Sequence, residues 1–324
     1  MLGRLLRIVR WEFWPIWAMY LPLAPYLLWL AIRHRSTRVF MASNPGMFSG
    51  GLVGESKPGI LAELAKRAPE FTPAFRVVRR GGQIEAEMFP VVAKPDRGER
   101  GQGVRVIRSQ ADLDAYLAAA PCDTILQEYV SGLEFGIGCM RRPGAESFEI
   151  TSLTHKTFPI VVGDGIHTLE DLVLRDPRAV CLAQRYAMEL GPRAKEVPAP
   201  GVEVQLVEIG SHSRGSIFLD ASRLGTPQLT AAIARVAKAH PGFHIGRFDL
   251  RSPSIEALQR GEFRVLELNG VAAEPVHIYD PAVSMVSAYR ALAAHWRWAF
   301  AIGAANRKAG TIPAHWVDVL RAIH

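Results

Sequence analysis

The chain mixes short β-branched apolar runs with longer segments whose apolar residues recur at helical spacing, so it predicts both strands and helices. Strands are predicted at 38–42, 75–92, 104–107, 125–130, 149–153, 202–209, 216–219, 244–251 and 262–269. Helices are predicted at 60–65, 111–119, 169–174, 176–189, 228–239 and 281–301. Ser109 and Thr168 are the expected N-caps of two of these helices, and Asp280, followed by a proline, is expected to cap the last.

The N-terminal segment 11–32 is apolar and long enough to span a membrane. Three prolines and Glu12 argue against a straight span. Its aromatic residues are of the kind that favours a membrane–water interface, namely Trp11, Trp14, Trp17, Tyr20, Tyr26 and Trp29. Arginines flank both ends, so we expect a kinked interfacial anchor on an anionic surface. Alternatively, the segment packs on the protein's own core or on a second subunit.

Composition and charge narrow the class of protein. The 324 residues are 49% hydrophobic and 21% charged, typical of a folded chain with two or three subdomains. The net charge is +7, but residues 1–38 hold six arginines and one glutamate, so most of the excess lies in the N-terminal arm. The rest is nearly balanced, which argues against a nucleic-acid partner. Cys122, Cys139 and Cys181 show no zinc spacing or disulfide framework, so we expect a reducing compartment.

A lysine at the end of a predicted strand precedes a glycine-rich loop. Lys94 follows the apolar run 91–93, and Pro95 ends the strand. The loop that follows contains Gly98, Gly101 and Gly103, whose backbone can come close to a ligand. An ammonium group beneath free N–H groups suits a polyphosphate, although a hairpin with a solvated lysine would show the same pattern.

Three oxygen donors fall on two neighbouring predicted strands. Glu267 and Asn269 are two residues apart, so their side chains share a face, and Asp249 stands near the end of the strand 244–251. Two carboxylates and an amide oxygen are suitable ligands for Mg²⁺, which takes its other ligands from phosphates and water. By itself, the Glu-x-Asn pattern is also that of a solvated strand face.

Taken in order, these motifs resemble the ATP-grasp superfamily, in particular D-alanine–D-alanine ligase-like and cyanophycin synthetase-like carboxylate–amine ligases. The resemblance rests on four motifs over residues 55–280, which are Lys94-Pro95 with its loop, Gln-Glu-Tyr-Val at 127–130 with Glu134, Gly-Arg-Phe-Asp at 246–249, and Glu-Leu-Asn at 267–269. It implies an α+β fold in which two α/β subdomains with antiparallel sheets clasp ATP. The implied segments are an arm (1–40), a reduced N-terminal segment (41–85), small (86–150) and large (151–280) subdomains, and C-terminal helices (281–324).

The resemblance also implies which residues hold ATP and the metal. The residues implied to contact the phosphates are Lys57, Lys94, Gly98, Gly101 and Gly103. Those implied to hold adenine and ribose are Gln127, Glu128, Val130 and Glu134. The implied ligands of Mg²⁺, with Mn²⁺ as an alternative, are Asp249, Glu267 and Asn269. Arg247 would stabilise the acyl phosphate, and Lys156 would lie near the transferred phosphoryl group. The alternatives are surface lysines for Lys57 and Lys156 and a structural ion pair for Arg247.

Two departures from the family pattern change the expected substrates. The usual Rossmann-like domain before the grasp is missing or reduced here, and residues 270–275 differ from the sequence that receives D-alanine. The resemblance therefore implies an ATP-dependent, ADP-forming ligase for another small carboxylate and amine, working through an acyl phosphate. We expect it in the cytoplasm, peripheral on the inner face of the membrane, with a homodimer as a further expectation. The alternatives are a phosphotransferase on the same fold and a non-catalytic ATP-binding module at the membrane.

Overall fold

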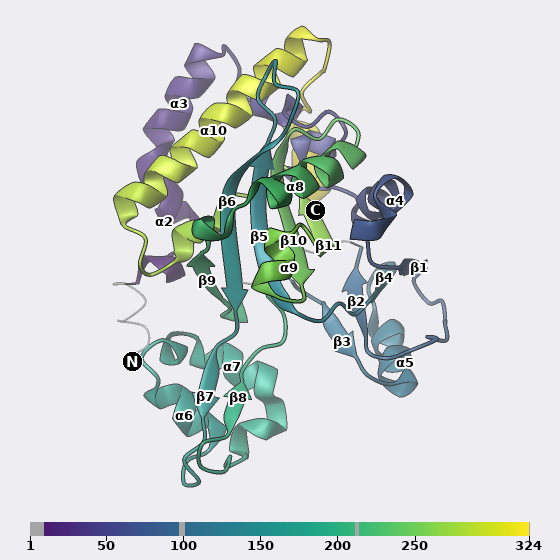
Figure 1. Ribbon diagram of the computed structural model, residues 1–324, viewed down its shortest axis with the longest axis vertical. Coiled ribbons are helices and arrows are strands. Elements are labelled where there is room, and N and C mark those ends of the chain that lie inside the picture. Colours follow the sequence, from purple (N-terminus) through teal and green to yellow (C-terminus); the bar gives the residue numbers. More distant parts are fainter. Residues whose placement is uncertain (1–9, 97–100, 211–213, 324) are drawn as a thin grey trace.

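The computed structural model describes residues 10–96, 101–210 and 214–323, which form two antiparallel sheets, a smaller third sheet and a helical layer (Figure 1). The four-stranded sheet has the order β1-β4-β2-β3. Its strands are β1 (Phe75–Val78), β2 (Val91–Pro95), β3 (Arg105–Ile107) and β4 (Thr124–Glu128). Alternate apolar residues of these strands pack against α5 (Gln110–Ala119), which Ser109 caps as expected.

The five-stranded sheet has the order β11-β10-β5-β6-β9, and each neighbouring pair is antiparallel. Its strands are β5 (Leu133–Met140), β6 (Glu149–Thr157), β9 (Ile217–Asp220), β10 (Ile245–Ser252) and β11 (Arg264–Asn269). One face forms the largest apolar core with α4 (Lys57–Arg67), α8 (Pro227–Ala239) and α9 (Ile255–Gln259). The expected α+β class with antiparallel sheets is therefore confirmed.

A third lobe hangs below the five-stranded sheet in Figure 1. It contains the two-stranded sheet of β7 (Ile160–Val162) and β8 (Glu203–Gln205) with α6 (Leu169–Arg175) and α7 (Ala183–Leu190). These elements enclose an apolar core of their own around Tyr186. Thr168 caps α6 in a reciprocal capping box with Asp171, as the sequence predicts.

The N-terminal arm is helical and lies along the C-terminal helix, as Figure 1 shows for α3 and α10. It consists of α2 (Ile16–Tyr20), a 3₁₀ turn (Leu21–Leu23) and α3 (Ala24–Arg33), and it packs on α10 (Met285–Lys308). Met19, Leu23 and Leu30 are buried in this contact. By length and composition, the span Ile16–Arg33 is apolar enough to cross a membrane. Of this span, 17% is buried inside the protein.

The structure corrects several predicted elements. Residues 38–42 form a buried 3₁₀ helix (Val39–Ala42) instead of a strand, because all four of its side chains are enclosed and no alternating face is needed. Ser284, not Asp280, caps α10, which begins only at Met285. The Asp280 carboxylate instead accepts from the backbone N–H groups of Asp220 and Ala282, both at 2.7 Å. The hairpin expected between β10 and β11 contains α9.

Candidate active site

The second face of the five-stranded sheet carries charged side chains. Asp249 stands opposite Glu267 of β11, and Arg247 stands opposite Asn269. Because side chains alternate along a strand, these four residues project from the same face. The residue facing Asp249 on β5 is Gly136, where a Cβ atom would lie 3.3 Å from Arg247 Cδ and 3.4 Å from Asp249 Oδ1. The glycine therefore leaves room for the charged groups to lie across the sheet.

These charges form a continuous buried network. Lys156 Nζ lies 3.0 Å from Asp249 Oδ1 and 3.4 Å from Glu134 Oε1. Arg247 Nε contacts Asp249 Oδ1 at 3.0 Å, and Arg251 Nη2 contacts Glu134 Oε2 at 3.0 Å. Lys156 is 3% exposed and Glu134 is 5% exposed, so water screens these pairs little. Removing one member would leave a buried charge without its counter-charge.

The network determines the charge state of Asp249. Burial alone would raise the pKa of this carboxyl group, but Arg247 and Lys156 outweigh burial and lower it to about 2. The pKa of Arg247 is raised, because Asp249 outweighs the opposing effect of burial. Asp249 is therefore an ionised carboxylate at neutral pH, the form that a hard metal ion requires.

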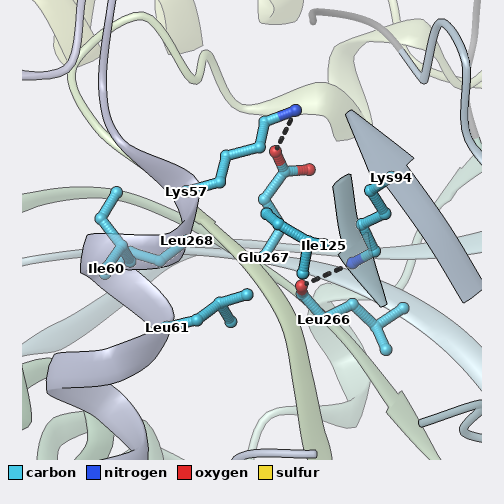
Figure 2. Close-up of a pocket in the computed structure, with 8 residues that line it drawn as sticks. All are labelled: Lys57, Ile60, Leu61, Lys94, Ile125, Leu266, Glu267 and Leu268. Atoms are coloured by element: carbon cyan, nitrogen blue, oxygen red, sulfur yellow. Dashed lines mark hydrogen bonds and ion pairs between the residues drawn. The ribbon is translucent and has the colours of Figure 1, made fainter. Parts of the chain in front are cut away.

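A narrow pocket separates the two larger sheets, and Figure 2 shows the side chains that line it. Lys57, at the start of α4, reaches across to Glu267 Oε1 at 3.5 Å. Lys94 of β2 donates from Nζ to the carbonyl oxygen of Leu266 at 3.1 Å. The apolar part of the lining comes from Ile60, Leu61, Ile125, Leu266 and Leu268. The structure therefore brings together two lysines and a carboxylate from three distant parts of the chain.

Burial in this pocket lowers the pKa of Lys94 to about 8. The nearby charge of Lys57 acts in the same direction, whereas Glu267, Glu134 and Asp249 oppose it. The pKa of Lys94 therefore depends on the charge of Lys57 and on the acids of the five-stranded sheet. The pocket itself is small, with a volume of about 10 Å³, which holds about one water molecule.

Two buried amide nitrogens at predicted ligand positions have no hydrogen-bond partner in the described part of the chain. They are Gln127 Nε2, on a side chain that is 1% exposed, and Asn269 Nδ2. Both groups can donate hydrogen bonds to a ligand. Gln127 of β4 pairs with Val92 of β2, and paired residues project to the same face of a sheet. Val92 and Lys94 are two residues apart on one strand, so Gln127 and Lys94 share a face of the small sheet.

The other predicted nucleotide contacts have protein partners in this structure. The Glu128 carboxylate accepts from the N–H group of Ala74 at 3.1 Å and from Arg264 Nη2 at 3.2 Å. The carbonyl oxygen of Val130 accepts from Arg251 Nη1 at 2.8 Å. Glu134 is held by Lys156 and Arg251, as described above. Nucleotide contacts from Glu128 or Glu134 side chains would therefore require these pairs to rearrange.

Only part of the glycine loop can be described, because Gly98 lies outside the described residues. Gly101 and Gly103 have φ values of 73° and 72°, a backbone conformation that favours glycine. The carbonyl oxygen of Gly103 accepts from Tyr116 Oη at 2.8 Å, which fastens this end of the loop to α5. The loop contacts predicted for ATP remain predictions.

Residues that the sequence reasoning missed also belong to this region. Arg251 pairs with Glu134, and the alternation along 244–251 would have placed it on the face of Arg247 and Asp249. Glu274 accepts from Tyr20 Oη at 2.8 Å, a contact between residues 254 positions apart. No local pattern could have indicated that pair, because Tyr20 belongs to the N-terminal arm.

The predicted metal site combines carboxylate and amide donors. Among the described residues, no group of three or more His, Cys, Asp or Glu side chains is arranged to hold a metal ion. The predicted set contains two carboxylates, Asp249 and Glu267, as direct cross-strand neighbours, and the third donor is the Asn269 amide. Oxygen donors of this kind are compatible with Mg²⁺, which keeps few protein ligands.

Sequence similarity to known proteins is low and covers part of the chain. No protein-family model matches the chain. The chain is 24% identical over 192 residues to the glutathione biosynthesis bifunctional protein GshAB of Streptococcus agalactiae serotype V, and equally to that of serotype III. The match covers 52% of this chain and 24% of those proteins, so the chain spans about a quarter of their length.

Sequence identity to the solved structures that resemble this chain is also low. A bifunctional glutathione synthetase from Pasteurella multocida is 16% identical with a TM-score of 0.40, covering 76% of this chain and 38% of that one. D-alanine–D-alanine ligase from Bacillus anthracis, complexed with ATP, is 14% identical with a TM-score of 0.42, covering 78% and 68%. L-amino acid ligase from Bacillus licheniformis is 15% identical with a TM-score of 0.38, covering 72% and 42%. Each of these matches covers part of the chain at 24% identity or less, and each structural match has a TM-score below 0.5.

Proposed function

We propose that this protein is an ATP-dependent ligase that joins a small carboxylate to an amine and releases ADP and phosphate. The observation that carries the proposal is the pocket between the sheets, where Lys57 and Lys94 face Glu267 beside the network of Asp249. Such a pairing of cations and acids suits a bound nucleoside triphosphate, because the lysines offset phosphate charge and the acids hold a metal.

The residues present fit Mg²⁺. Asp249, Glu267 and Asn269 would hold one or two ions through their side-chain oxygen atoms, with Mn²⁺ as an alternative. Bound there, the metal would neutralise charge on the phosphates. Lys156, Arg247 and Lys57 supply the counter-charges of the acids.

The chain's own residues then have separate tasks. Lys57 and Lys94 would hold the phosphates beneath the loop of Gly98, Gly101 and Gly103. Gln127, Glu128, Val130 and Glu134 would hold the nucleoside. Arg247 and Lys156 would stabilise the acyl phosphate that forms when the substrate carboxylate attacks the γ-phosphoryl group and ADP leaves. Attack of the amine on the acyl carbon would then release phosphate, and closure of the glycine loop would exclude water from the intermediate.

Entry of a nucleotide requires the cleft to open. Its volume of about 10 Å³ is far smaller than a nucleotide, and the Lys94 ammonium spans it to the Leu266 carbonyl oxygen. We infer that the four-stranded sheet moves away from the five-stranded sheet and that Lys94 exchanges this carbonyl group for phosphate oxygens. Hinge opening around ligands is a common motion between subdomains.

Trapping with hydroxylamine tests the proposed reaction. The protein is incubated with ATP, Mg²⁺ and each member of a panel of amino acids and other carboxylates, and ADP and hydroxamate are measured. We expect at least one carboxylate to give both products in equal amounts, because hydroxylamine attacks the acyl phosphate. Chelation of the metal with EDTA should abolish both.

The alternatives give different results in this assay. A phosphotransferase would form ADP and a stable phosphorylated product without hydroxamate. A non-catalytic module would bind ATP and form no ADP with any acceptor. Either result would contradict the ligase assignment.

We also propose that the protein is peripheral on the inner face of the cytoplasmic membrane. The arm's inner face is buried on α10, whereas its outer face exposes large apolar side chains, including Trp17 (69%), Leu21 (67%) and Ile32 (67%). Arg33 lies over the ring of Trp29 at 5.5 Å, so a cation adjoins this face. Exposed aromatic and aliphatic residues beside arginines are typical of a surface that binds anionic lipid.

Point substitutions on the outer face test this attachment better than deletion of residues 1–38, which would also remove buried Met19, Leu23 and Leu30. The double variant Trp17→Ala, Trp29→Ala is expected to bind vesicles containing phosphatidylglycerol at least tenfold more weakly. Burial of each large apolar side chain contributes about 1.5–3 kcal/mol. Co-sedimentation measures the binding, and Trp316→Ala, an exposed tryptophan of α11 (Trp316–Ile323), is the control.

Unchanged vesicle binding in the double variant would contradict the membrane proposal. If the substitutions instead dissociate a homodimer in sedimentation experiments, the outer face is a subunit interface.

A further inference from the structure

A carboxylate beside the candidate active site accepts from two phenols, and the nearby Arg247 charge interacts with it without a direct ion pair. Glu274 follows β11, and its carbonyl oxygen accepts from Arg247 Nη1 at 3.2 Å. In the part of the chain that the structure describes, only Tyr20 and Tyr279 donate to its carboxylate, and no lysine, arginine or histidine forms an ion pair with it. A carboxylate can accept about four hydrogen bonds. It therefore has capacity for further donors from a ligand.

The phenols that hold Glu274 are themselves fixed in place. Trp296 of α10 donates from Nε1 to Tyr20 Oη at 3.2 Å, so the Tyr20 proton is directed to Glu274. Tyr20 lies in α2 of the N-terminal arm, whose neighbouring residue Met19 is buried. The arm thus supplies one side of the surroundings of Glu274.

Aromatic rings connect this carboxylate with the charged network. The ring of Tyr279 stacks on Trp11 of the arm, with centroids 6.0 Å apart, and contacts Phe218 at 6.4 Å. Lys156 Nζ, which pairs with Asp249, lies 5.7 Å from the centroid of Phe218. Faces of aromatic rings attract cations, and rings of this kind bind ammonium ligands in proteins.

We propose that Glu274, Tyr20 and Tyr279 form a subsite for the ammonium group of the amine substrate, with the N-terminal arm as one wall. Glu274 is then a positioning residue that holds the amine beside Arg247 and the reacting carboxyl group. The identification of this ligand as a substrate rests on the proposed ligase function. In this proposal, the N-terminal arm forms part of the substrate site beside the reduced N-terminal segment.

Binding of a simple amine tests the subsite without ATP. Saturation-transfer NMR is used to titrate n-butylamine, which is cationic at pH 7.5, and 1-butanol, its neutral counterpart. We expect saturable binding of butylamine to the full chain and at least tenfold weaker binding of butanol. Glu274→Gln, which keeps the shape and removes the charge, should weaken butylamine binding at least tenfold. Tyr20→Phe should weaken it severalfold, because the carboxylate is no longer held in place by the Tyr20 hydroxyl group.

Tyr26→Phe is the matched control, since it removes a phenol from the same arm at a ring that stacks on Trp29. It should bind butylamine like the unsubstituted chain. Equal binding of butylamine by Glu274→Gln, or absence of binding by the unsubstituted chain, would overturn the subsite. Thermal melting shows whether each variant is folded, and Tyr20→Phe decides the question if Glu274→Gln is not. Failure of hydroxamate formation would instead overturn the ligase reaction and leave the butylamine result unaffected.

Discussion

Substituting Lys94 by methionine is expected to lower ATP-dependent ADP formation by a factor on the order of 10³ or more, without loss of thermal stability. In the proposed reaction, the Lys94 ammonium offsets charge on the phosphates, and comparable cationic groups in phosphoryl transfer contribute about 10³–10⁵-fold. The side chain is only partly exposed, and its ammonium is bound to a carbonyl oxygen in the cleft. Replacing a poorly solvated charge by an apolar group of similar length is often neutral or stabilising.

The combination of lost activity and retained stability distinguishes a functional lysine from a structural one. ADP release and thermal melting measure the two effects, and Lys66→Met, an exposed lysine of α4, is the control for both. A Lys94→Met variant with normal turnover would exclude this residue from the phosphate site. A variant that melts at much lower temperature would show that the ammonium mainly supports the fold.

The pH dependence of the same lysine provides a second measurement. Because burial lowers its pKa to about 8, the free protein loses the Lys94 charge as the pH rises through this value. We therefore expect kcat/KM for ATP to fall above about pH 8, since this ratio reports the free enzyme. The unfolded chain, with an ordinary pKa of 10.5, binds more protons between about pH 8 and 10.5. The contribution of Lys94 to stability therefore rises with pH across that range.

Asp249→Asn is expected to destabilise the protein by about 3–5 kcal/mol and to abolish measurable ADP formation. The substitution removes the carboxylate that pairs with Lys156 and Arg247, and breaking a buried ion pair from one side has an effect of about this size. It also removes an oxygen donor of the proposed metal site. Urea denaturation measures the free energy of unfolding, and a coupled assay measures ADP.

An exposed pair is the control for the effect on stability. Glu262→Gln interrupts the contact of Arg260 with Glu262 at 2.7 Å on the surface, and we expect no measurable change in the melting temperature. Equal stability of Asp249→Asn and the unsubstituted chain would mean that the ion pairs of Asp249 contribute nothing to the free energy of unfolding. Retained ADP formation in Asp249→Asn would remove Asp249 from the metal assignment.

The low pKa of Asp249 also determines how stability should change in acid. Its folded value of about 2 lies below the ordinary value of 3.8, so its contribution to stability is fully present above about pH 4. This contribution is lost as the pH falls toward 2. The Asp249→Asn variant should lack this part of the acid transition.

The sheet elements of the site could be predicted because strand geometry is local. A period of two places Glu267 and Asn269 on one face, and β11 carries both. The helix caps Ser109 and Thr168 were also local signals, since a cap bonds to backbone N–H groups within the first turn. The 3₁₀ helix at Val39–Ala42 was not predictable in this way, because burial on all sides gives an apolar run without a period.

Pairing between distant segments could not be predicted. Nothing near Glu274 indicates that Tyr20 hydrogen-bonds to it, and nothing near Lys57 indicates Glu267 as its partner. The sequence showed an apolar arm with aromatic residues, which predicted a membrane-interfacial anchor and left packing on protein as the alternative. In the structure, one face of the arm is buried on α10 and the other is exposed.

The sequence by itself determined the helix caps at Ser109 and Thr168, the basic strand end with its glycines, and the acids that share a strand face. These features follow from bonding and steric restrictions within a few residues. The tertiary structure alone decided which charges are paired across the sheet, how narrow the cleft is, and that the arm adjoins Glu274. Those properties depend on which distant surfaces are enclosed together, and burial is what changes the strength of each charge.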